Sequence, residues 1–482
     1  MNGIMTLQPE QIIAKHSIKK GVMIMKLSIV LNHKQLDSKF RMISHEDTGN
    51  PKLIFVDEQY YLIANIDALE NLEDVRMLGG KIRKKVQEIN VSEVEIYFYQ
   101  LIEVLSHFSE EELVTAFMEG WYLASYQFNK YTPVKSKENI TTVFSKREYI
   151  TLAKKAITRA NAVNVARDLC NEPANKLTPA IYAERIESLF KTTKATVEII
   201  GQEDLIDRGF IATEVVGRGS SNAAGVAIIS LKNNPSDASQ TALVGKGVTF
   251  DTGGTNVKTA RDIGEMKMDM GGSAAVVGAM KLLADMDADV NVTGILPLVT
   301  NVAGSRAYLP SDIIEYDNGK VVEVGNTDAE GRLILADGIL YAQKIGAKTI
   351  IDIATLTGAI GGALGLKYAG IFSTNERQLW HYKTLGERCG DYIWPMPLVE
   401  DYYDYLKSTV AHINNMSSSS YGGAITAAMF LKSFVSSECD WVHIDMANTV
   451  RPWKEQGYYV PGASGFGVRL LTEMILNKEL VE

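Results

Sequence analysis

The sequence is poor in cysteine. Only three of its 482 residues are cysteines, namely Cys170, Cys389 and Cys439, and no two of them form a CxxC pair. Such an odd and widely spaced set argues against a disulfide framework and is typical of proteins in a reducing compartment. We expect all three to be small apolar residues of the core.

Long hydrophobic runs are missing as well. No apolar stretch approaches the roughly 18 to 20 residues that are needed to cross a bilayer. Residues 1–25 are interrupted by Lys15, Lys19 and Lys20, and they lack the apolar centre and cleavage site of a secretory signal. We therefore expect a cytoplasmic protein with no membrane partner, in which residues 1–25 are an extension before the folded region.

An excess of positive charge and three common catalytic motifs are also lacking. The 58 acidic residues exceed the 49 basic ones and give a net charge of -9, so a broad surface for nucleic acid is not expected. The chain contains no HExxH, no GxSxG and no GxxxxGK[ST] segment. These absences argue against a helical zinc-peptidase site, a serine hydrolase and a P-loop nucleotide site.

The residues that are present indicate a globular protein of about two domains. Strand-like and helical stretches alternate over residues 26–145, which predicts a small N-terminal α/β domain, and residues 146–172 read as a connecting helix. Over residues 173–482, near-continuous apolar runs such as "KTIIDIATL" are typical of strands covered on both faces. We therefore expect an α/β fold whose larger C-terminal catalytic domain has a central mixed, largely parallel sheet with helices on both faces.

Three polar clusters follow predicted strands, where the ligands of such a sheet gather. The first, "VGKGVTFDTGGTNVK", places Lys246 inside an apolar strand and Asp251 near its end. A buried lysine charge is costly. Either its neutral amine is a metal ligand, or the lysine pairs with a core carboxylate or extends its amine to the edge. From this strand alone we favour the second interpretation.

The other two clusters each precede a helix. Asp269, in "EMKMDMGG", is by itself best interpreted as an N-cap of the helix that follows. In "EVGNTDAEGRL", Asp328 and Glu330 are two positions apart and cannot share a helical face. In an extended turn both could point towards one ion, with Gly331 allowing the chain to turn tightly.

Taken together, the clusters supply four carboxylates and one anomalous lysine. Four like charges that converge without a cation would raise one another's pKa values and destabilise the fold. Two divalent ions about 3.5 Å apart would neutralise them, activate a water and polarise a carbonyl or phosphoryl oxygen. Mainly oxygen ligands suit Mg²⁺ and Mn²⁺ as well as Zn²⁺. Phosphoryl transfer at two metals therefore stays open as an alternative from the residues alone.

With these motifs the sequence resembles the leucyl aminopeptidase family of dinuclear metallopeptidases, including its peptidase B branch. "NTDAEGRL" matches the family signature, and "VGKGVTFDTGG", "MKMDMGG", "ATLTGA" and "NEPAN" match further blocks in the same order. The resemblance implies one metal held by Lys246, Asp251, Asp269 and Glu330, and a second held by Asp251, Asp328 and Glu330. It also implies that Lys258 is the catalytic lysine and that Arg332 holds a bicarbonate acting as general base.

The resemblance further implies a reaction and an assembly. A metal-bridging hydroxide would remove the N-terminal residue, leucine or another apolar residue by preference, from small peptides. The ions would be Mn²⁺ or Zn²⁺, with Mg²⁺ as a further option, and the subunits would form a homohexamer of two stacked trimers. Some relatives bind DNA, an alternative that the acidic balance disfavours. The first side-chain pocket would be formed by Met266, Thr355, the Leu356 backbone, Gly358, Ala447 and Val450.

Overall fold

The structure is a computed structural model that describes residues 12–14, 26–32, 51–56, 59–89, 93–132, 140–236, 240–259 and 263–477. Within the expected extension at residues 1–25, it thus describes Ile12–Ala14 alone. The described residues form two compact units. The first runs to Asn164 and also includes Lys454–Pro461, and the second comprises Val165–Trp453 with the residues from Gly462 onwards.

The first unit is built on a six-stranded sheet with α-helices. In spatial order the strands are β1 (Ile12–Ala14), β6 (Thr141–Phe144), β5 (Glu93–Tyr97), β2 (Lys26–Asn32), β4 (Gln59–Asn65) and β3 (Lys52–Val56). The helices are α1 (Leu72–Ile89), α2 (Tyr99–Val104) and α3 (Glu110–Leu123). Helices α1 and α3 pack closely, and the absence of a side chain at Gly120 allows this. A Cβ atom at that position would lie 1.8 Å from the Arg76 carbonyl oxygen. This unit is the smaller α/β domain that the sequence predicts.

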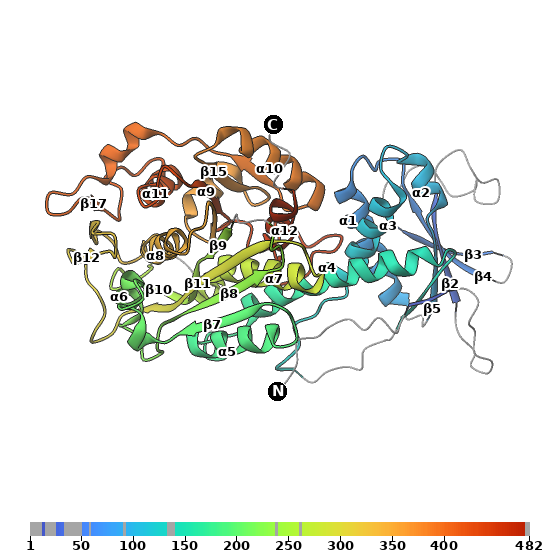
Figure 1. The fold of residues 1–482 in the computed structure, drawn as a ribbon. Coiled ribbons are helices and arrows are strands. Elements are labelled where there is room, and N and C mark those ends of the chain that lie inside the picture. The colour runs from blue at the N-terminus through green and yellow to red at the C-terminus, as the bar shows by residue number, and fades with distance from the viewer. Residues whose placement is uncertain are drawn as a thin grey trace. The chain divides into compact units, whose positions relative to one another are not determined.

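A segment from far along the chain completes this first unit. The Tyr458 hydroxyl donates to Glu73 Oε1 at 2.8 Å, and Lys84 Nζ donates to the Tyr459 carbonyl at 2.5 Å. The first unit is therefore formed by two separate segments of the sequence. Helix α4 (Glu148–Asn171) carries the chain from the first unit into the second (Figure 1).

The second unit contains a nine-stranded sheet. Its strands are, in spatial order, β16 (Ile393–Pro395), β15 (Ala369–Ser373), β18 (Asp440–Asp445), β14 (Thr349–Ala354), β9 (Thr241–Gly245), β11 (Asn291–Val302), β8 (Gly225–Lys232) and β7 (Thr196–Ile200), with β10 (Gly247–Gly254) also paired to β11. Strand β8 is antiparallel to both neighbours, and β15 is antiparallel to β18. The other pairs are parallel. This confirms the expected mixed, largely parallel sheet.

Helices cover both faces of this sheet (Figure 1). One group of contacting helices consists of α5 (Pro179–Phe190), α7 (Gly271–Asp285), α10 (Glu376–Cys389) and α12 (Val468–Leu476). The other consists of α6 (Ile211–Gly217), α8 (Glu330–Lys344), α9 (Gly358–Leu364) and α11 (Gly423–Lys432). A small third sheet joins β12 (Ile313–Glu315), β13 (Val321–Glu323) and β17 (Ile413–Asn414). Short 3₁₀ turns lie at η3 (Gln202–Asp204), η4 (Ile263–Met268) and η5 (Glu400–Leu406).

The sheet topology gathers polar residues at one edge. Strands β9, β11, β14 and β18 are connected by parallel pairings, so their carboxyl ends point the same way. Lys246 follows β9, Asn301 is near the end of β11, and Asp445 ends β18. Ligand sites of α/β sheets lie outside such strand ends.

Two expectations from composition can be compared with this fold. Cys170 and Cys389 are buried and free, as expected, whereas Cys439 is only partly buried. The expectation of a core position is therefore wrong for Cys439. Among the helices of the described ranges, none combines the length and the apolar character needed to span a bilayer.

Candidate metal centre

Lys246 is the most deeply buried cation of the site. It lies between β9 and β10 and is 3% exposed, and its Nζ donates to Asp269 Oδ1 at 2.9 Å and to the Thr355 carbonyl at 3.0 Å. Glu330 Oε1 is 2.9 Å from the same Nζ. Burial alone would lower the pKa of Lys246, but the charges of Asp269 and Glu330 outweigh it and raise the pKa. The lysine therefore pairs with core carboxylates, the interpretation favoured from the strand alone. A cation bound among these carboxylates would lower the pKa of the lysine and make its neutral amine available as a ligand.

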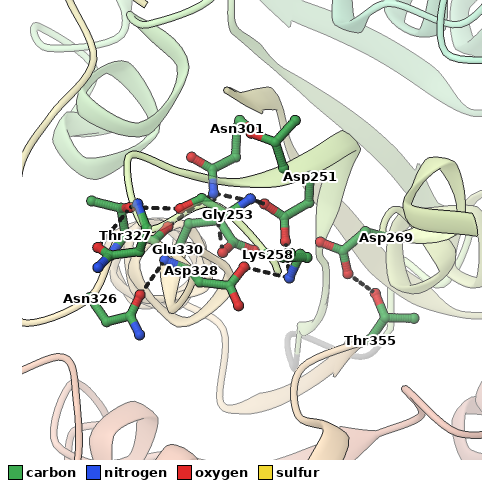
Figure 2. A network of polar contacts seen from close by, with 12 residues as sticks. Asp251, Gly253, Lys258, Asp269, Asn301, Asn326, Thr327, Asp328, Glu330 and Thr355 are labelled. Atoms are coloured by element: carbon green, nitrogen blue, oxygen red, sulfur yellow. Dashed lines mark hydrogen bonds and ion pairs between the residues drawn. The ribbon is translucent and has the colours of Figure 1, made fainter. Parts of the chain in front are cut away.

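Three carboxylates converge beside this lysine. Asp251, Asp328 and Glu330 each offer an oxygen atom, and these atoms all lie within 4.8 Å of one another. Asp251 belongs to β10, Asp328 precedes α8, and Glu330 is the first residue of that helix (Figure 2). The turn before α8 thus does bring both carboxylates of "NTDAEGRL" to one point. No other such group of three potential ligands occurs within the described ranges.

Asp269 is held beside the site by Lys246 and Thr355. Its Oδ1 accepts a hydrogen bond from Lys246 Nζ at 2.9 Å. The same atom accepts from the Thr355 hydroxyl at 2.8 Å (Figure 2). Helix α7 has Met270 as its N-cap, and no side chain caps it. The interpretation of Asp269 as an N-cap is therefore wrong, because its carboxylate is turned towards Lys246 instead of the helix.

Gly331 also has a different role from the expected one. It is the second residue of α8 and is not one of the described glycines with a positive φ. The prediction that it permits a tight turn is therefore wrong. Its lack of a side chain serves packing, because a Cβ atom there would lie 2.6 Å from Lys246 Cε.

Lys258 lies on the more open side of the carboxylates. Its Nζ is 2.8 Å from Asp251 Oδ2 and also forms an ion pair with Asp328 (Figure 2). Burial lowers the pKa of Lys258, but Asp251 and Asp328 outweigh burial and raise it. The lysine is therefore an ammonium at neutral pH and can donate hydrogen bonds to a developing negative charge.

Arg332 is buried one helical step beyond Gly331. Its Nη1 donates to the Asn415 carbonyl at 2.9 Å, and its guanidinium lies 6.0 Å from the Phe430 ring centre. Burial lowers the pKa of Arg332 to about 10, against the charges of Glu330 and Asp445. Within the described structure its Nε has no hydrogen-bond partner. The arginine thus retains donor capacity for an anion.

Asn301 is a residue of the site that the sequence interpretation missed. Its side-chain amide donates to Asp251 Oδ1 at 2.8 Å, to the Thr327 carbonyl at 2.9 Å and to Glu330 Oε2 at 3.4 Å. It is 0% exposed. One neutral amide therefore orients two of the carboxylates. The only signal in the sequence was a polar residue closing the apolar run "VNVTGILPLVTN".

Most of the expected pocket residues are near one another. The Val450 and Thr355 methyl groups flank Gly271, where an added Cβ atom would lie 2.8 and 3.3 Å from them. The backbone N–H groups of Leu356 and Ala447 both donate to Asp445 Oδ1. Gly358 begins α9 and is exposed, and the Met266 carbonyl accepts from the Asp269 N–H at 3.3 Å.

The donor set fits divalent cations. Burial, followed by the charge of Asp251, raises the pKa of Glu330 to about 8, and burial raises the pKa of Asp269 to about 6 despite Lys246. Such shifts show that the carboxylates are crowded in a site of low polarity. Cations among them would relieve this repulsion, and oxygen ligands with a single amine suit Mn²⁺, Zn²⁺ or Mg²⁺.

Comparison with known proteins supports a relationship across both units. The probable cytosol aminopeptidase of Rickettsia felis is 38% identical over 430 residues, which cover 86% of this chain and 85% of that protein. The cytosol aminopeptidase of Rickettsia prowazekii is 37% identical with the same coverage. The solved structure of the bottromycin maturation enzyme BotP matches with a TM-score of 0.84 at 27% identity, covering 93% of this chain and 98% of that one. Its complex with Mn gives a TM-score of 0.83 at 27% identity, covering 94% and 98%.

The same comparison identifies the family. Residues 164–472, which contain every residue of the candidate centre, match the catalytic domain of the cytosol aminopeptidase family. This match covers more than half of the chain and agrees with the two relatives named above. The chain therefore belongs to the cytosol aminopeptidase family and is a metallo-exopeptidase of the aminopeptidase class.

Proposed function

We propose that the protein is a two-metal aminopeptidase that hydrolyses the N-terminal residue, with a preference for leucine or another apolar residue, from small peptides. The observation that carries this proposal is the convergence of Asp251, Asp328 and Glu330, with oxygen atoms within 4.8 Å of one another. Lys246 lies 2.9 Å from Glu330 of this group, and Asp269 lies 2.8 Å from Lys246. Family membership selects peptide hydrolysis over phosphoryl transfer.

The five residues would hold two ions. Lys246, Asp251, Asp269 and Glu330 would hold one, and Asp251, Asp328 and Glu330 the other, so that Asp251 and Glu330 are shared. When bound, the ions would supply Lewis-acid polarisation of the scissile carbonyl and lower the pKa of a nucleophilic water. Mn²⁺ or Zn²⁺ is proposed, with Mg²⁺ as a further option. The solved complex of BotP with Mn supports Mn²⁺ as the first ion to test.

Lys258 would stabilise negative charge on the substrate. Its raised pKa keeps it protonated, so it acts as a hydrogen-bond donor and not as a general base. Its side chain is 22% exposed and can reach a peptide that enters from the solvent side. Donors aimed at a developing oxyanion are among the largest contributions to catalysis of acyl transfer.

Arg332 would hold the group that moves the proton. Its guanidinium is fixed by the Asn415 carbonyl at 2.9 Å while Nε remains available. Arg332 would hold a bicarbonate there, and this group would supply general-base and then general-acid chemistry to the reaction. A buried arginine is suited to this because its planar fork matches a planar oxyanion.

The proposed pocket and setting follow the same relationship. Thr355, Val450 and Ala447 offer methyl groups, which suit an apolar first residue. We further propose a homohexamer of two stacked trimers, and a cytoplasmic location in keeping with the names of the curated relatives. Small peptides would be its partners, whereas nucleic acid is not expected from a net charge of -9.

A metal-replacement assay tests the proposal. The purified protein is stripped with EDTA and then given Mn²⁺ or Zn²⁺, and release of the first residue is followed over a panel of unblocked dipeptides. Activity should vanish on stripping and return with metal. Glu330→Gln should abolish activity and weaken metal binding, whereas Glu438→Gln, at an exposed glutamate, should change neither. A metal-loaded parent that cleaves no dipeptide would refute the proposal.

A further inference from the structure

Asp445 is a fully buried carboxylate at the end of β18. It is 0% exposed. Its Oδ1 accepts hydrogen bonds from the backbone N–H groups of Leu356, Thr357 and Ala447 at 3.2, 3.3 and 3.3 Å. Its Oδ2 accepts from the Thr357 hydroxyl at 2.6 Å. Oδ1 thus accepts from donors of two separate loops, and Oδ2 accepts from one of them.

The surroundings only partly compensate the charge of this carboxylate. Burial raises the pKa of Asp445 above its ordinary value, and His443 and the hydrogen bonds from Thr357 and Ala447 offset part of this rise. His443 lies two residues earlier, on the same face of β18. Its ring is in turn 2.5 Å from Asp352 Oδ1 on β14. An ionised group in the interior is costly unless donors surround it, and here the donors come from functional loops.

The two loops are the proposed walls of the first-residue pocket. Leu356 and Thr357 belong to the turn between β14 and α9, next to the Thr355 carbonyl that accepts from Lys246 at 3.0 Å. Ala447 belongs to the loop after β18 that leads to Val450. The walls face each other, because the Thr355 and Val450 methyl groups both flank Gly271.

We infer that Asp445 is a positioning residue that fixes the spacing of these two walls and thereby sets the size selectivity of the pocket. This inference rests on the proposed function, since only an aminopeptidase would use the pocket for the first residue. The Met446 N–H donates to the Ala354 carbonyl at 2.8 Å where the two strands end. Beyond this hydrogen bond, the carboxylate of Asp445 accepts from the backbone of both walls.

Selectivity is the property that this connection should control. One methylene group in an apolar pocket changes kcat/KM by about 10- to 200-fold, so small changes in wall spacing are measurable. In the proposed pocket a leucine side chain would extend to both walls, whereas an alanine side chain would be too short to do so. Loosening the walls should therefore harm a leucine substrate more than an alanine substrate.

The test compares Asp445→Asn and Asp445→Ala with the parent as Mn²⁺-loaded full-length enzymes. The asparagine keeps one acceptor oxygen, and the alanine keeps none. The readout is the ratio of kcat/KM for leucine and alanine p-nitroanilides, together with Mn²⁺ affinity. We expect the ratio to fall at least about tenfold in Asp445→Ala and less in Asp445→Asn, with Mn²⁺ affinity unchanged. Asp440→Asn, at the exposed start of β18, should leave the ratio unchanged.

The ratio does not depend on the fraction of enzyme that is folded. If Asp445 had a merely structural role, its variants would lower kcat/KM equally for both substrates. The ratio would then stay at the parent value, which would overturn the inference. If Asp445→Ala does not fold, Asp445→Asn and Thr357→Val carry the same test, each with a smaller expected fall. A parent that cleaves neither substrate would instead overturn the proposed function, and this inference with it.

Discussion

Gly331 leaves the space that Lys246 occupies. A Cβ atom at position 331 would lie 2.6 Å from Lys246 Cε and 2.8 Å from its Nζ. The signature segment before α8 and the lysine after β9 are therefore complementary in shape. The amine reaches Glu330 at 2.9 Å only because the next residue of the helix has no side chain.

Gly331→Ala should therefore reduce activity without unfolding the protein. An alanine inside a helix normally adds about 1 kcal/mol of stability over glycine, but here it would displace the lysine. A shift of a ligand by about 1 Å can cost about 100-fold in rate. The measurements are kcat/KM for a leucine substrate and Mn²⁺ affinity. Gly362→Ala, at a helical glycine with nothing within 4 Å, is the control; equal activities in both variants would refute the packing argument.

Asn301→Leu should weaken metal binding while nearly keeping the volume of the side chain. The change removes the amide that donates to Asp251 Oδ1 at 2.8 Å and to Glu330 Oε2 at 3.4 Å. Partners that orient metal ligands are typically worth about 10- to 100-fold in affinity. Free Mn²⁺ can be followed by its electron paramagnetic resonance signal during titration. Asn291→Leu, at the start of the same strand, is the matched control, and parent-like affinity in Asn301→Leu would count against this role.

Lys258→Met should lower kcat but should not weaken Mn²⁺ binding. Its ammonium lies 2.8 Å from Asp251 Oδ2, so its removal leaves the carboxylates more negative and more attractive to a cation. Loss of one donor to an oxyanion typically costs about 100- to 1000-fold in kcat. Steady-state kinetics and a metal titration on the same sample separate the two effects. Lys344→Met, at an exposed ion pair, is the control. A variant with normal kcat, or with clearly weaker Mn²⁺ binding, would contradict the proposed role.

Asp337 should make stability depend on pH. It is 0% exposed, and burial raises its pKa from the ordinary 3.8 to about 7, although bonds from Thr213 lower it. Between those two values the folded state binds more protons than the unfolded state, so stability falls as pH rises through that window. Each pH unit there costs up to about 1.4 kcal/mol.

Asp337→Asn should remove this dependence. Its midpoint of thermal unfolding, relative to that of the parent, should rise as the pH is raised from 5 to 7. The comparison is made at one scan rate, because large proteins often unfold irreversibly. Asp404→Asn, at an exposed aspartate paired with Lys407, should follow the parent at every pH. If the difference in unfolding midpoint between Asp337→Asn and the parent stayed constant from pH 5 to 7, the carboxyl would not titrate in this range.

Much of the fold could be predicted from the sequence because its cause is local. Near-continuous apolar runs require strands buried on both faces, and β9, with all five of its residues buried, bears this out. The carboxylates were found because each follows a strand or precedes a helix within a short motif. Taken by itself, Asp269 was misinterpreted as an N-cap for the same reason. Its neighbours in sequence suggest an N-cap, whereas Thr355 and Lys246 draw it elsewhere.

The sequence by itself determined the α/β class, the family and the candidate ligands, since periodicity and contiguous motifs record which residues are available. Only the tertiary structure decided how they pair. Asn301 lies opposite Asp251 because β10 and β11 pair in that register, across 50 positions of the chain. Asp445 likewise meets Leu356 only because β18 lies beside β14. Such partners depend on strand order and register, which arise from the packing of the whole sheet and leave no local pattern.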